Sequence, residues 1–170
     1  MSWLDGFDEK GRPKLIPGKL KWVGTASTIS GTNWWPPSYS PKTGLFYVPA
    51  RARNGEGPGN GYGAVQALDP RTGEKKWEFK RNDAWFASGV LTTASGLLFS
   101  GTTGDTYSGP VARRRADGYF YALDAGTGQL LWQMSLAGSV DGSPMTYAAG
   151  GTQYVAVAAG NVLFAFALRQ

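Results

Sequence analysis

Two stretches of the chain repeat each other at a fixed distance, and this repeat limits the possible fold more than any other feature. Residues 63–77 and 118–132 align without a gap at an offset of 55 residues, and seven of the fifteen aligned positions are identical. In each copy, a run rich in β-forming residues leads into Asp69 or Asp124, which opens an Asp-x-x-Thr-Gly stretch. Such an Asp accepts backbone N–H bonds, and the Gly accepts a positive φ. Each copy therefore predicts an antiparallel hairpin.

Further strand pairs lie around these hairpins, so that the repeating unit holds four strands in about 50 residues, the size of a propeller blade. The sequence predicts blades at about residues 34–79, 85–134 and 142–168. The third blade has no fourth strand and no closing tryptophan. Residues 1–32 show no clear period, and we expect them to form an extended connecting segment.

Three blades, the last of them incomplete, cannot close a ring, because propellers use about four to eight. The open sheet edges would expose unpaired N–H and C=O groups. We therefore expect an all-β, partial β-propeller that forms the C-terminal part of a larger ring. In the alternative, the 170-residue chain is complete and builds a ring by self-assembly.

Composition excludes several kinds of chemistry. The chain contains neither cysteine nor histidine, which rules out disulfides, thiolate zinc sites, Cys nucleophiles and any His base. The net charge of +5 is dispersed, and no nucleic-acid-binding motif accompanies it. The basic cluster at residues 113–115 is either an exposed loop or a contact to an acidic partner. No apolar run is long enough to span a membrane, and the first residues do not resemble a signal peptide.

The hairpin motif, Asp-x-x-Thr-Gly-x-x-x-Trp, resembles the tryptophan-docking repeat of quinoprotein dehydrogenases, which use pyrroloquinoline quinone (PQQ). Three segments resemble the alcohol dehydrogenase branch of that family: TNWWPPSYSPKTGLFYVP at residues 32–49, WFASGVLTT at 85–93 and LDGFDEKGRP at 4–13. The resemblance implies an eight-bladed propeller with the quinone near its axis. It also implies a calcium ion as Lewis acid, an Asp base, and hydride transfer from an alcohol to the quinone.

Few residues of that cofactor site match this chain. Asn33 matches a position whose amide hydrogen-bonds the polar edge of the quinone in similar enzymes, and Trp34 lies beside it. Trp85 matches a tryptophan that approaches the quinone from the ring wall. In the alternative, Asn33 is a turn residue at the entrance to a strand, and Trp34, Trp35 and Trp85 only pack within or between blades.

The resemblance places no catalytic residue and no metal ligand on this chain; the Asp base and the calcium ligands are expected outside it. Asp83 and Asp141 lie in turns, where Asp usually caps its own backbone, so we expect neither to act as a base. Trp77 and Trp132 are expected to be structural docking residues.

The resemblance implies part of a PQQ-dependent dehydrogenase that oxidises alcohols to aldehydes. We expect the isolated chain to be inactive. The implied partners are the remaining blades, an alcohol and an electron acceptor such as a cytochrome, and the implied location is the periplasm. A non-catalytic propeller that serves as a binding or assembly scaffold is the alternative.

Overall fold

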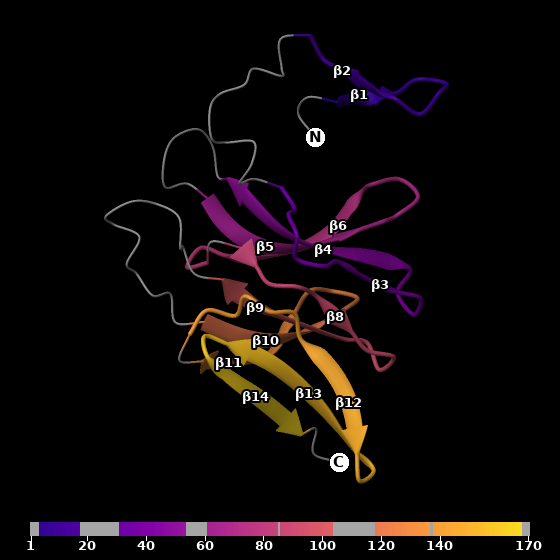
Figure 1. Ribbon diagram of the computed structural model, residues 1–170. Coiled ribbons are helices and arrows are strands. Elements are labelled where there is room, and N and C mark those ends of the chain that lie inside the picture. The colour runs from indigo at the N-terminus through magenta and orange to yellow at the C-terminus, as the bar shows by residue number, and fades with distance from the viewer. Residues whose placement is uncertain are drawn as a thin grey trace, which may run out of the picture.

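The computed structural model describes residues 4–17, 31–53, 61–84, 86–103, 118–136 and 138–167, and these residues form strands and turns without any helix. Every strand pairing is antiparallel. Three larger sheets follow one another in chain order (Figure 1). The predicted all-β fold of consecutive antiparallel sheets is therefore confirmed. Nothing in the described part of the chain forms a helix that could cross a membrane.

The first sheet has four strands in the order in which they occur along the chain. They are β3 (Ser38–Ser40), β4 (Leu45–Arg53), β5 (Gly61–Leu68) and β6 (Lys75–Arg81). The hairpin predicted at residues 63–77 is the β5–β6 pair, in which Ala67 lies opposite Trp77.

The second sheet repeats this arrangement, except that its first strand is divided into two pieces. Both β7 (Phe86–Ala87) and β8 (Leu91–Thr92) pair with β9 (Leu97–Thr103), and β10 (Gly118–Asp124) and β11 (Leu130–Leu136) follow. Ser88 bridges the gap between the two pieces, because its hydroxyl accepts the N–H of Gly101 at 2.8 Å. The hairpin predicted at residues 118–132 is the β10–β11 pair.

The third sheet consists of β12 (Met145–Ala149), β13 (Thr152–Ala159) and β14 (Val162–Ala167). Among the residues that the structure describes, no fourth strand joins it. A separate two-stranded hairpin, β1 (Leu4–Phe7) and β2 (Pro13–Leu15), lies within the segment that we expected to be an extended connection.

The two repeated turns have the predicted construction. Asp124 accepts the N–H of Thr127 at 2.8 Å and its hydroxyl at 2.9 Å, and Gly128 has a φ of 74°. In the first copy, Asp69 accepts the N–H of Arg71 at 2.8 Å, and Gly73 has a φ of 72°. The shared motif therefore specifies this local geometry in both sheets.

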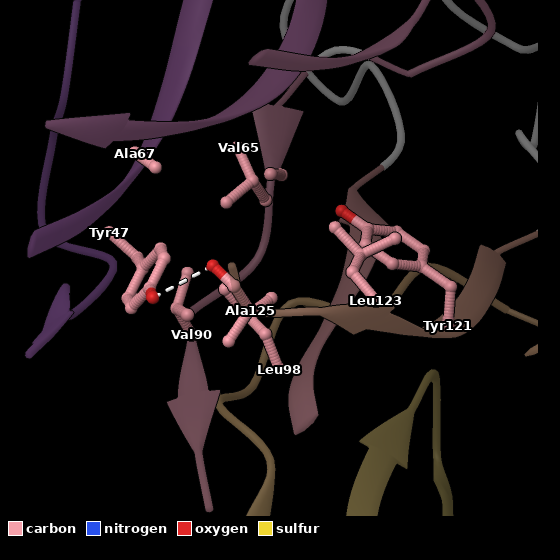
Figure 2. Packing of buried hydrophobic residues seen from close by; sticks show 9 residues of the cluster. Tyr47, Val65, Ala67, Val90, Leu98, Tyr121, Leu123 and Ala125 are labelled. Atoms are coloured by element: carbon pink, nitrogen blue, oxygen red, sulfur yellow. Dashed lines mark hydrogen bonds between the residues drawn. The ribbon is translucent and has the colours of Figure 1, made fainter. Parts of the chain in front are cut away.

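The core lies between the sheets, and strands β9 and β10 of the second sheet are buried on both faces. Successive residues of a strand point to opposite faces, so Leu98 faces the first sheet while Phe99 faces the third. Figure 2 shows the cluster between the first two sheets. It contains Tyr47, Val65, Ala67, Ala87, Val90, Leu98, Tyr121, Leu123 and Ala125.

One carbonyl in the turn between β10 and β11 accepts hydrogen bonds from two side chains of the first sheet. The Tyr47 hydroxyl donates to the Ala125 oxygen at 2.8 Å (Figure 2), and the Trp77 indole N–H donates to the same oxygen at 3.2 Å. The Trp77 ring also lies so close to Gly128 that a Cβ there would stand 2.6 Å from it. Trp77 thus docks on the turn of the next sheet, whereas Trp132, its equivalent in the repeat, is 39% exposed.

Candidate cofactor-binding rim

The segments by which the chain enters the three sheets meet one another. We call these segments, residues 33–37, 86–90 and 139–143, the inner rim. Val90 donates its N–H to the Pro36 oxygen at 3.0 Å, which joins the first and second sheets. A Cβ on Gly89 would collide with the Ser143 side chain, so the second and third sheets also approach closely. The inner rim therefore brings together residues that are far apart in the sequence.

The first strands themselves also touch, since the hydroxyls of Ser38 in β3 and Thr92 in β8 are 2.7 Å apart. Consecutive sheets that converge at their first strands are typical of blades arranged around a common axis.

Asn33 and Trp34 lie side by side on the exposed part of the inner rim. The Asn33 side-chain oxygen accepts the N–H of Trp34 at 2.9 Å, so it caps the turn into the first sheet. Trp34 is 66% exposed. An exposed indole offers both an apolar face and an N–H donor to a planar ligand. The structure places two of the three predicted cofactor residues together and accessible, and it also gives Asn33 the turn role of the alternative hypothesis.

The Trp35 ring lies between the Trp34 and Phe86 rings. It stacks on Trp34, with centroids 4.3 Å apart and planes 26° apart, and it packs against Phe86 at 4.7 Å. Its indole N–H donates to the Asp141 carbonyl oxygen at 3.0 Å, and only 8% of the residue is exposed. One side chain of the first sheet therefore contacts both of the other sheets, as the packing alternative for Trp35 expects.

Trp85, the third predicted cofactor residue, lies outside the described residues. The residues on either side of Trp85 form hydrogen bonds to the first and the second sheet. The Ala84 oxygen accepts the N–H of Gly63 at 2.9 Å, and Phe86 donates its N–H to the Thr103 hydroxyl at 3.1 Å.

Asp83 and Asp141 are both engaged by neighbouring side chains. Arg81 donates two hydrogen bonds to the Asp83 carboxylate, at 2.9 and 2.7 Å, and a third to Gln133 of the second sheet at 2.9 Å. Asp141 accepts a bond from the Ser139 hydroxyl at 2.8 Å. Within the described ranges, no group of three acidic, His or Cys side chains could hold a metal ion. The rim therefore offers stacking and hydrogen-bonding groups rather than a metal centre.

Comparison with known proteins relates this fold to a defined class. Residues 84–155 match the PQQ family of glucose, ethanol and alcohol dehydrogenase β-propeller domains. Over 94% of its length, the chain is 32% identical to a quinoprotein ethanol dehydrogenase of Pseudomonas putida and covers 29% of that protein. It is 33% identical to a 1-butanol dehydrogenase (quinone) of Thauera butanivorans, with the same two coverages.

Solved structures agree with this relationship. The quinohemoprotein alcohol dehydrogenase ADHIIG from Pseudomonas putida HK5 matches 94% of the chain with a TM-score of 0.70 and 28% identity, and 28% of that structure is covered. A europium-containing methanol dehydrogenase matches 92% of the chain with a TM-score of 0.69 and 28% identity, and 31% of that structure is covered.

The fold is therefore a partial β-propeller of the quinoprotein type. The predicted resemblance is confirmed: the chain is similar to PQQ-dependent alcohol dehydrogenases and matches part of their propeller. It spans less than a third of the length of these relatives.

Proposed function

We propose that this chain is part of the propeller of a PQQ-dependent alcohol dehydrogenase and supplies one wall of its cofactor pocket. The observation that carries the proposal is the inner rim, where Asn33 and the exposed Trp34 lie side by side in the segment that enters the first sheet, near the contacts among the three sheets. The relationship to quinoprotein ethanol and butanol dehydrogenases supports it.

The described residues fit a role in binding the quinone. Trp34 would contact the planar rings through its exposed face, and the Asn33 amide would hydrogen-bond a polar edge. We propose that Trp85 completes this wall. Bound PQQ would accept the hydride removed from an alcohol as it becomes an aldehyde, with a calcium ion as Lewis acid. The calcium ligands and the base are proposed to lie outside this chain.

The first test measures whether the protein, purified from the cells that naturally produce it, contains PQQ. We expect the purified protein to contain PQQ, extractable and measurable by absorbance, and to reduce an artificial dye with alcohols. A periplasmic location and a cytochrome acceptor belong to the same proposal and are tested by cell fractionation and by reduction of added cytochrome. The isolated 170-residue chain with added PQQ and calcium is expected to show no dye-linked turnover.

Variants separate an enzyme from a scaffold. Asn33→Ala and Trp34→Ala should each weaken PQQ binding about fivefold, because each removes roughly 1 kcal/mol of hydrogen bonding or ring contact. Thr32→Ala is the control, since Thr32 is an exposed neighbour in the same turn. An assembled protein that contains no PQQ, and that keeps its assembly unchanged in both variants, would identify it as a non-catalytic scaffold.

A further inference from the structure

We propose that Trp35 is a positioning residue, which holds the ring of Trp34 in the orientation that contacts the quinone. The inference rests on the proposed function, because it assigns Trp34 to the cofactor wall. It adds a role for a residue that the sequence could connect only with packing.

The first observation is a ladder of three aromatic rings. Trp34 stacks on Trp35 at 4.3 Å, and Trp35 packs on Phe86 of β7 at 4.7 Å. Exposure falls steeply along the ladder, from 66% at Trp34 to 8% at Trp35 and 2% at Phe86. The outer ring is therefore accessible, and the two rings beneath it are embedded in the protein.

The second observation is that a directional hydrogen bond, in addition to packing, fixes the Trp35 ring. Its N–H donates to the Asp141 oxygen at 3.0 Å, so it cannot turn over or slide without losing a hydrogen bond. Asp141 lies in the loop that precedes the third sheet, and its carboxylate accepts a hydrogen bond from the Ser139 hydroxyl of the same loop. The orientation of Trp35 is thus set by a loop 106 residues away in the chain.

The consequence concerns Trp34, whose exposed ring could otherwise adopt several rotamers. Stacked aromatic pairs gain stability beyond area burial, which favours the one rotamer that keeps the two rings in contact. Because Trp35 covers one face of Trp34, the opposite face remains for a ligand. A preoriented ring loses less conformational entropy on binding.

Trp35→Phe separates positioning from folding. A phenyl ring still packs between Trp34 and Phe86 but cannot donate to Asp141. Asp141 is exposed, so water can satisfy its carbonyl, and the cost to stability should be small. In the isolated chain, we expect unfolding to remain a single cooperative transition and the exciton circular-dichroism couplet produced by two stacked indoles to be lost. Trp34→Phe should abolish the same couplet, and Trp132→Phe is the control that should preserve it.

The decisive experiment is a double-mutant cycle measured by PQQ titration of the assembled protein. Trp35→Phe should weaken PQQ binding about fivefold when Trp34 is present, because the ring is no longer held in its binding rotamer. In the Trp34→Ala background, the same change should have no further effect. A purely structural role would give equal losses in both backgrounds, and that result would overturn the inference.

The other outcomes are also decisive. A couplet that survives Trp34→Phe and Trp35→Phe would show that the stack is absent in solution, which overturns the inference and leaves the proposed function standing. If PQQ binding is weakened in Asn33→Ala but unchanged in Trp35→Phe, the inference is likewise overturned and the proposed function stands. A wild-type assembly that binds no PQQ overturns the proposed function, and the positioning role falls with it.

Discussion

The carbonyl of Ala125 allows a quantitative test of how two neighbouring sheets are held together. It is fully buried and accepts one hydrogen bond from Tyr47 and another from Trp77. Tyr47→Phe removes one donor, and Trp77→Phe removes the other. Either single variant leaves the oxygen with one partner, whereas the double variant leaves it with neither.

The expected free energies follow from this geometry. Each lost hydrogen bond costs about 1 kcal/mol, and Trp77→Phe loses about 1 kcal/mol more through reduced contact of the smaller ring. The Tyr47 hydroxyl also hydrogen-bonds the Thr43 hydroxyl, so Tyr47→Phe loses two hydrogen bonds. The free energy of unfolding should therefore fall by about 2 kcal/mol in each single variant. An unsatisfied buried acceptor carries a further penalty of about 1–3 kcal/mol. The double variant should thus lose at least about 5 kcal/mol instead of the additive 4.

Urea unfolding of the isolated chain, followed by far-ultraviolet circular dichroism, measures these differences independently of tryptophan fluorescence. Combining Trp77→Phe with Tyr154→Phe is the control pair, because Tyr154 lies in the third sheet and stacks on Tyr147. That pair should be additive. If Tyr47→Phe and Trp77→Phe also add within error, the shared carbonyl does not couple the sheets and the argument is refuted.

Two further predictions concern the second sheet. Gly118→Ala should destabilise the chain by about 1–3 kcal/mol in urea unfolding, because the new Cβ would collide with the Gly138 oxygen. Gly142→Ala, where a Cβ would meet only ordinary contacts, should cost less, and equal losses would contradict this explanation. Hydrogen bonds from the Thr127 hydroxyl and N–H hold the pKa of the Asp124 carboxyl below its usual value, so its contribution to stability is present at neutral pH and is lost as pH falls through that lowered pKa. Asp124→Asn should therefore flatten the fall in stability measured between about pH 5 and pH 2, and an unchanged profile would oppose the assignment.

The two repeated hairpins could be predicted because the residues that determine their turns are close together in the sequence. Asp124, Thr127 and Gly128 form a complete turn within five residues, and the same residue types stand at the same spacing around Asp69. The short hairpin near the N-terminus could not be predicted in this way. Its turn uses Asp8, which accepts two backbone N–H groups, but its strands show no alternating pattern.

The contacts of the candidate site could be predicted only in part. The resemblance pointed to Asn33 and Trp34, and the structure places both on the inner rim. No sequence pattern could indicate that the Trp35 indole bonds to Asp141, because the two residues are 106 positions apart and the acceptor is a backbone oxygen. Such contacts depend on how the sheets converge, which is a property of the whole fold.

The convergence of the sheets also explains how the inner rim can be tightly connected while a groove remains between the second and third sheets elsewhere. An apolar groove lined by Leu131, Trp132 and Phe166 lies between the second and third sheets, where Phe166 stacks on Phe120 and meets the edge of Trp132. At the inner rim, by contrast, the backbone of Gly89 lies close against the Ser143 side chain, and the Trp35–Asp141 hydrogen bond links the first sheet to the third. Because directional hydrogen bonds limit displacement more than apolar ring contacts do, we expect the position of the Trp34 ring to be set at the inner rim and not by how the outer groove is filled.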